Sequence, residues 1–156
     1  MTVMTVLDLM NVFFAGMLAG IEFVIHYGVR EPAEQLSDHS QLQFRKALVI
    51  KLRVLVPAFF APAAILGIGL TFLNTTMPGF VFRCVAVVAL LIWIVIRVIG
   101  TVPINSATVD WALDAPPQDW KAQVTYAERF HIVGVWAAVL TFACFLLAVA
   151  LRLATH

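Results

Sequence analysis

Long apolar runs alternate with short polar segments along the chain. A helix needs about 20 mainly apolar residues to cross the hydrocarbon core of a bilayer, and four runs reach that length. They predict transmembrane helices at approximately residues 6–28, 52–73, 80–101 and 130–151. The pattern therefore predicts one four-span membrane domain over residues 1–156, folded as an all-α, antiparallel four-helix transmembrane bundle.

The links between the runs differ in length and chemistry. NTTMPG at 74–79 is short enough to force an antiparallel hairpin between the second and third spans. The links at 29–46 and 102–129 are longer and polar. Pro32 is expected to stop the first helix, and the prolines at 116–117 indicate that the fourth helix starts outside the hydrocarbon.

Composition supports a membrane protein. Of 156 residues, 62% are hydrophobic and 12% are charged, and the mean hydropathy is +0.96. These values exclude an ordinary soluble domain. The net charge of +1 gives no indication of nucleic-acid binding. Cys84 and Cys144 lie far apart in apolar runs, so we expect buried thiols without a disulfide framework. The first run lacks a preceding basic residue and a cleavage site, so it is interpreted as a retained span.

Basic residues predict the orientation. Lys and Arg gather on the cytoplasmic side of membrane proteins. Of the ten such residues, only Arg83 and Arg152 fall on the side of the termini and the short link. The side of the longer links carries the other eight: Arg30, Arg45, Lys46, Lys51, Arg53, Arg97, Lys121 and Arg129. We therefore expect a multi-pass protein of the bacterial inner membrane, with both termini on the non-cytoplasmic side.

Polar residues of all four predicted helices converge near the cytoplasmic face. In the first helix, a stripe of polar and small residues should face the bundle interior: Asp8, Asn11, Ala15, Ala19, Glu22 and His26. Arg53, Arg97 and Asn105 reach the same level from the second and third spans. Two interpretations are open for Glu22, which either forms a structural ion pair with Arg53 or Arg97 or takes part in a chemical site.

Four of these residues have metal-binding chemistry. Glu128 and His131 form an ExxH pair on one helical face, a pattern that binds metals in the core of some four-helix proteins. Together with Glu22 and His26 they form a candidate ligand set for a single metal. Alternatively, His26 and His131 hold a haem, or Glu128 serves as a partner of the helix dipole. The sequence leaves three cofactor states open: none, one metal or a haem.

Three short motifs, in their order along the spans, carry a family resemblance. They are GIE at 20–22, VPIN followed by Trp111 at 102–111, and ERFH at 128–131. Over nearly its whole length the chain resembles the anthrone oxygenase-like family of small four-span membrane proteins. The resemblance implies an oxygenase that acts on a flat phenolic substrate, without requiring a cofactor.

The resemblance also implies roles for individual residues. His131 would be the base, Asn105 and Arg53 would stabilise a substrate oxyanion, and Glu22 would orient a histidine. The sequence departs from the family pattern at Gly134, where the family has an arginine. A glycine there either opens space for a ligand or lets another helix approach.

Three functions remain in competition. The first is a membrane oxidoreductase or oxygenase for a lipophilic aromatic or quinone-like molecule. The second is a non-catalytic small subunit of a larger membrane complex, and the third is a small proton-coupled exporter that uses Glu22. The expected partners are the lipid bilayer, a lipophilic small molecule and either a second copy or a larger membrane complex, with no nucleic acid.

Overall fold

The protein is a bundle of long helices. The computed structural model describes residues 2–73, 75 and 78–155. Helix makes up 89% of the described residues, and these contain no strand. Four helical stretches are long and apolar enough to cross a membrane: Val3–Glu34, Asp38–Leu73, Phe80–Asp110 and Trp120–Ala154. The prediction of an all-helical, multi-pass membrane protein is confirmed at this level.

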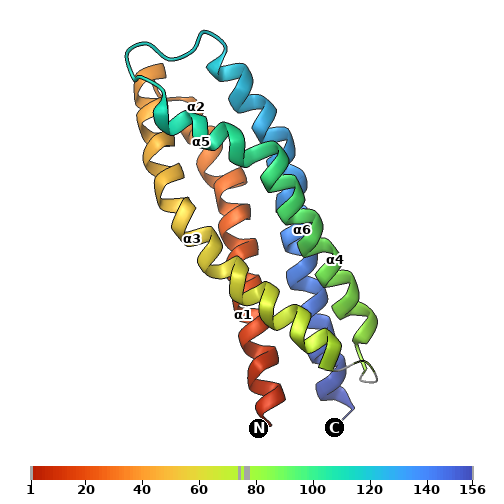
Figure 1. Ribbon diagram of the computed structural model, residues 1–156. Helices are drawn as coiled ribbons and strands as arrows, with labels where there is room; N and C mark the ends of the chain where they lie inside the picture. The colour runs from red at the N-terminus through yellow and green to blue at the C-terminus, as the bar shows by residue number, and fades with distance from the viewer. Residues whose placement is uncertain (1, 74, 76–77, 156) are drawn as a thin grey trace.

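Two of the four stretches are built from three segments each. The elements in order are α1 (Val3–Val24), the π-helix η1 (Ile25–Val29), α2 (Arg30–Glu34), α3 (Asp38–Leu73), α4 (Phe80–Ile96), the π-helix η2 (Arg97–Thr101), α5 (Val102–Asp110) and α6 (Trp120–Ala154). Successive stretches run in alternate directions, and both termini lie at the same end of the bundle (Figure 1).

The helices extend beyond the apolar runs. The second begins at Asp38 rather than near residue 52, and the fourth at Trp120 rather than near 130. An apolar run measures only the part of a helix that suits hydrocarbon, whereas the polar first turns are stabilised locally. At the start of α3, the Ser40 backbone N–H donates to the Ser37 hydroxyl at 3.4 Å, which satisfies one of the free N–H groups of the first turn.

Two expectations about the links were wrong. Residues 102–110, predicted as part of a link, form α5 and continue the third helix. Pro32 does not stop the first helix, because it lies in the first turn of α2, where the missing N–H of proline breaks no helical bond. Both segments follow a π-helix, so the chain at this end of the bundle is more helical than its polarity suggested.

A glycine joins the short link to α4. Residues 74, 76 and 77 of the predicted hairpin at 74–79 lie outside the described residues. Gly79 has φ of 87°, in the left-handed region that suits glycine. A Cβ atom there would also lie 2.8 Å from the Ala148 backbone on α6. Both the turn and the close approach of α6 therefore require glycine at this position.

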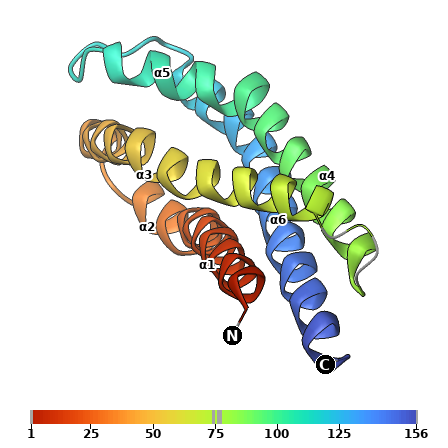
Figure 2. The same ribbon diagram turned by 60° about the horizontal axis from the view of Figure 1, so that its bottom comes forward.

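Helix α6 is central to the packing. It lies along α4 and also contacts α1, while α1 packs on α3 (Figure 2). Small buried residues allow the helices to approach closely: Ala15, Ala63, Ala86 and Cys144 surround Phe145 in one cluster. A second cluster includes Leu18, Leu90 and Trp93. The core thus depends on small-to-large packing along the seam between α1, α4 and α6.

Three charged residues, named here the terminal ion cluster, join these helices near the termini. They are Asp8 of α1, Arg83 of α4 and Arg152 of α6, and each is buried. Arg83 Nη1 lies 2.7 Å from Asp8 Oδ1, and Arg152 Nη1 contacts Asp8 Oδ2. Arg152 also donates to the Thr5 hydroxyl at 3.1 Å. Because an unpaired charge is costly within a bilayer, this cluster fixes the three helices relative to one another.

We predict that Asp8→Asn destabilises the bundle strongly. The substitution leaves two buried guanidinium groups without a counter-charge, a loss that costs about 3–5 kcal/mol in comparable buried pairs. Thermal unfolding in detergent, followed by circular dichroism, measures the effect.

Asp38→Asn is the matched control. Asp38 forms an equally short pair with Lys121, at 2.6 Å, but both side chains are more than half exposed. Exposed pairs contribute about 0–1 kcal/mol, so this variant should unfold close to wild type. Equal effects of the two substitutions would contradict the structural role of the terminal ion cluster.

Candidate functional site

A second set of buried polar residues, named here the central polar cluster, lies toward the opposite end of the bundle. It consists of Glu22 from α1, Arg97 from η2, and His131 from α6. Arg97 Nη2 lies 3.2 Å from Glu22 Oε1, and His131 Nε2 lies 3.4 Å from Glu22 Oε2. All three are at least nine-tenths buried. The partner of Glu22 is thus Arg97, and Arg53 lies elsewhere.

The contacts define the direction of the hydrogen bonds. Arg97 Nη1 lies 3.4 Å from His131 Nδ1. Because a guanidinium can only donate, Nδ1 must be the acceptor in a neutral imidazole. The ring proton is then on Nε2, which faces both the carboxylate and, at 3.5 Å, the backbone carbonyl of Glu22. His131 Nε2 therefore donates to the Glu22 backbone carbonyl, and Arg97 donates to His131. The Glu22 carboxylate oxygens lie close to both side chains but have no hydrogen-bond partner among the described residues.

Both π-helices lie beside this cluster. Arg97 and Thr101 are the first and last residues of η2, and both are buried. His26 lies in η1, and its ring stacks on His131 with the centroids 5.6 Å apart and the planes at 20°. A π-turn shifts the phase of a helix and is frequent at functional sites. In this protein the two π-helices lie at the ends of the apolar parts of the first and third spans, and they bring His26, Arg97 and Thr101 to the bundle interior.

A ring of surface polar contacts closes this end of the bundle. Arg30 contacts Glu128 and Glu34, each at 2.8 Å. Arg45 Nη2 donates to Asn105 Oδ1 at 2.8 Å, which ties α3 to α5. Glu128, predicted near Glu22, is therefore held by an arginine of α2. Because Glu128 pairs with Arg30, the side chains next to Glu22 and Arg97 are His131 and, stacked on it, His26.

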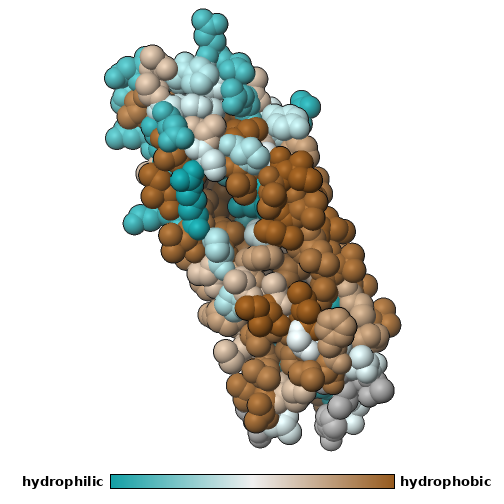
Figure 3. All heavy atoms as spheres, in the orientation of Figure 1, coloured by the Kyte–Doolittle hydropathy of each residue, from teal (hydrophilic) through white to brown (hydrophobic). Residues whose placement is uncertain are grey.

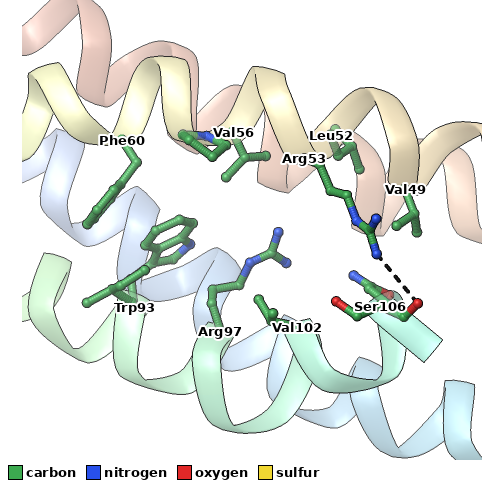
Figure 4. Close-up of a pocket in the computed structure, with 12 residues that line it drawn as sticks. Val49, Leu52, Arg53, Val56, Phe60, Trp93, Arg97, Val102 and Ser106 are labelled. Carbon is green, nitrogen blue, oxygen red and sulfur yellow. Dashed lines mark hydrogen bonds between the residues drawn. The ribbon is translucent and has the colours of Figure 1, made fainter. Parts of the chain in front are cut away.

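A cavity of about 260 Å³ opens between α3 and the α4–η2–α5 stretch. Its walls are mainly apolar and include Val56, Phe60 and Trp93. The Arg97 guanidinium extends into the same space (Figure 4) and lies 5.6 Å from the centroid of the Trp93 ring. On this side the molecular surface is hollowed, with hydrophilic atoms beside the hollow and hydrophobic atoms around it (Figure 3). We call this cavity the lateral pocket.

Two residues predicted to stabilise an oxyanion line the lateral pocket. Asn105 lies on α5, and Arg53 extends from α3 toward Ser106, whose carbonyl it approaches at 3.5 Å. Arg53 is exposed, so it lies at the mouth of the pocket rather than in the buried cluster. The structure therefore brings Arg53 and Asn105 to one pocket with Arg97, while His131 lies behind Arg97.

His131 lines a smaller cavity of about 70 Å³, named here the polar chamber. Its walls include His26, Arg45, Thr101 and Glu128. Four residues line both cavities: Val49, Leu52, Arg97 and Asn105. The two spaces are therefore adjacent, and Arg97 borders both.

The proposed metal ligands do not meet at one point. Among the described residues, no three His, Cys, Asp or Glu side chains form a group that could hold a metal ion. Glu128 pairs with Arg30. The rings of His26 and His131 are stacked face to face, with their centroids 5.6 Å apart. Metal or haem binding by Glu22, His26, Glu128 and His131 stays a prediction.

Gly134 of α6 faces Trp93 and Arg97. A Cβ at this position would lie 3.6 Å from Trp93 Cδ1 and 3.9 Å from Arg97 Cδ. Both are ordinary van der Waals distances, so an alanine would fit here without separating the helices. The guanidinium next to His131 comes from Arg97 of η2.

The helices and their two polar clusters define a multi-pass membrane protein with a polar site reachable from the side of the bundle. No family model, curated protein or solved structure matches the chain.

Sequence reasoning missed three site residues. Trp93 is 2% exposed and forms a wall of the lateral pocket. Thr101 and Arg45 line the polar chamber. The available signal for Trp93 and Thr101 was their helical spacing, because residues 93, 97, 101 and 105 recur every four positions and share one face.

We predict that Gly100→Ala disturbs this site. A Cβ on Gly100 would lie 2.1 Å from Cγ and 2.5 Å from Cβ of Phe130, so the backbones of η2 and α6 must separate. Overpacking of this kind costs about 1–3 kcal/mol, measurable as a lower melting temperature in detergent.

Gly134→Ala is the control on the neighbouring helix, because its nearest non-local atom would be at an ordinary 3.6 Å. It should melt close to wild type. If Gly100→Ala melts as late as Gly134→Ala, the packing of η2 on α6 is looser than described.

Proposed function

We propose that this protein is a membrane oxidoreductase of the oxygenase type that acts on a lipophilic aromatic or quinone-like molecule. The observation that carries the proposal is the lateral pocket. Its apolar walls suit a flat ring system that partitions into the bilayer. Arg97, on its inner side, offers hydrogen-bond donors to an oxygen of the substrate. Binding sites commonly combine apolar walls with a few placed polar groups in this way.

Each residue of the site would have a separate role in the reaction. Arg97 has five N–H groups, and its contacts with Glu22 and His131 use only part of them. The remaining donors, together with the Asn105 amide and Arg53, would stabilise negative charge on the substrate oxygen. For His131 to accept the substrate's proton at Nδ1, Arg97 would move its Nη1 donor from that nitrogen to the substrate oxygen. Glu22 holds both Arg97 and the imidazole in place, which makes it a positioning residue.

The reaction that suits these groups converts an activated ring methylene to a ketone with dioxygen. Loss of one proton gives an enolate, which transfers electrons to dioxygen and forms a hydroperoxide. The hydroperoxide then loses water, so that R₂CH₂ + O₂ yields R₂C=O + H₂O. The protein would supply a base, donors to the enolate and a site free of competing water. The resemblance to anthrone oxygenase-like proteins supports this reaction class.

The second candidate is a non-catalytic subunit of a larger membrane complex. It is favoured by the mutual contacts of the central polar cluster, because Glu22 lies within 3.4 Å of both Arg97 and His131, which also contact each other. Buried ion pairs of this kind can fix helix geometry without doing chemistry.

His131→Ala should separate the two functions. As a base, His131 would contribute about 10²–10⁴-fold to turnover, so the variant should lose that much activity. The assay follows oxygen uptake and ketone formation from anthrone by purified protein in lipid nanodiscs. Folding is checked by size-exclusion chromatography and thermal unfolding.

His39→Ala is the matched control, because this imidazole is more than half exposed and contacts only Asp114 among the described residues. It should retain wild-type turnover. A folded His131→Ala protein with unchanged turnover would overturn the assignment. A variant that instead loses co-purifying membrane proteins would support the subunit function.

We also propose that the protein lies in the bacterial inner membrane with the two longer links in the cytoplasm. The support is the basic residues at the α2, α3 and α5 end of the bundle, because Lys and Arg prefer the cytoplasmic side. Both termini lie at the other end. They would therefore face the periplasm.

Reporter fusions at the C-terminus test this orientation. Alkaline phosphatase needs disulfides, which form in the periplasm, so its fusion should be active. A green fluorescent protein fusion at the same position should be dark after export in unfolded form. The reverse pair of results would show that the termini are cytoplasmic.

A further inference from the structure

The polar chamber contains buried donors that the protein leaves unused. Among the described residues, neither Thr101 Oγ1 nor Arg45 Nε has a hydrogen-bond partner, although both atoms are buried. Thr101 is only 3% exposed. A buried polar group without a partner is destabilising, and most such groups in proteins are satisfied. Two of them in one chamber indicate that a bound group completes these hydrogen bonds.

The chemistry of the chamber favours an acceptor over a donor. Its walls carry three guanidinium groups, from Arg30, Arg45 and Arg97, and the Thr101 hydroxyl. Glu128 is the single carboxylate lining it among the described residues, and Arg30 already contacts that group at 2.8 Å. The group that matches this set is small, flat and accepts hydrogen bonds at two oxygens. A carboxylate has these properties and pairs well with arginine.

The chamber adjoins the lateral pocket along shared walls. Arg97 and Asn105 border both spaces, and in Figure 4 the Arg97 guanidinium lies in the gap between α3 and α5 with Trp93 and Phe60 beyond it. A molecule that bridges them would place an apolar body of up to about 260 Å³ against the aromatic walls. Its head would occupy about 70 Å³, which suits a carboxylate and excludes the glycerol and second chain of a phospholipid.

We propose that the two cavities form one binding site for a lipophilic carboxylic acid. Its ring body lies in the lateral pocket, and its carboxylate lies in the polar chamber on Arg45 and Thr101. The inference rests on the proposed function in naming the class of its substrate, but the binding itself requires no turnover. Hydrogen bonds between a charged acceptor and these donors are worth more than those of a neutral isostere. The site therefore distinguishes an acid from its ester.

The test compares 9-anthracenecarboxylic acid with its methyl ester. Binding to the purified protein in phosphatidylcholine nanodiscs is followed by probe fluorescence, and empty nanodiscs correct for partition into lipid. The acid should bind wild type about tenfold or more tightly than the ester, the difference expected for charge-assisted hydrogen bonds. Arg45→Gln and, separately, Thr101→Val should each reduce this ratio several-fold. The Thr101 variant preserves volume and charge, so it keeps the test valid if Arg45→Gln fails to fold.

Lys51→Gln is the control for surface charge. Lys51 is an exposed residue of α3 and lines neither of the two cavities, so its loss should leave the ratio unchanged. Equal affinity for acid and ester in wild type would overturn the proposal. The proposal would also be overturned if Lys51→Gln reduced the ratio of acid to ester affinity as much as Arg45→Gln or Thr101→Val does. Complete displacement of the acid by anionic phosphatidylglycerol would overturn it as well.

The outcome also separates this inference from the proposed function. Selective binding of the acid, reduced several-fold by Thr101→Val, would support the site even if no substrate is oxidised. Oxidation of neutral anthrone without any preference for the acid would overturn the inference and leave the oxygenase function in place.

Discussion

The contact on which the site depends is the buried ion pair between Glu22 and Arg97. It connects the first helix to the π-turn of the third, and His131 adds the fourth helix through its contact with the same carboxylate and its hydrogen bond to the Glu22 backbone carbonyl. In lipid, neither charge has water as an alternative partner. Loss of one side chain would therefore leave the other charge unpaired and destabilise the fold far more than loss of a surface pair does. The pair thereby determines where Arg97 lies, and Arg97 in turn borders both the lateral pocket and the polar chamber.

The two cavities differ because the helices change character at this level. On the side of Arg97 toward the termini the spans are apolar, and the space between α3 and α4 is lined by aromatic and aliphatic side chains. On the side of Arg97 toward the longer links, η1 and η2 bring polar residues inward, and arginine, histidine and threonine side chains line the polar chamber. A boundary between apolar and polar environments within a few residues is what an amphiphilic molecule requires, with its head and body recognised by different chemistry.

The number of spans and the interior stripe of the first helix were predictable from sequence, because a bilayer imposes strict rules of length and polarity. Asp8, Asn11 and Glu22 are all buried as their spacing required. Partner choice was not predictable in the same way. Glu22 had two cations at suitable depth, and the structure selects Arg97 through a π-turn that hydropathy does not reveal. The helix at 102–110 was missed, since polar residues outside the hydrocarbon follow capping and local packing rather than hydrophobic length. The prolines at 116–117, by contrast, correctly indicated that the fourth helix starts outside the hydrocarbon, as α6 does at Trp120.

The two ion clusters share a property that bears on how a ligand enters. Among the described residues, each cluster draws its charges from the first, third and fourth helical stretches, and α3 contributes to neither. Separating those three stretches would expose ions to hydrocarbon. Along its apolar part, moving α3 away mostly exchanges contacts with protein for equivalent contacts with lipid tails, which carries little hydrophobic penalty within a membrane. At its polar end α3 is held by Arg45 to Asn105 and by Asp38 to Lys121. The apolar part of α3 is therefore the side of the bundle that can separate at the lowest cost, and the lateral pocket lies along it.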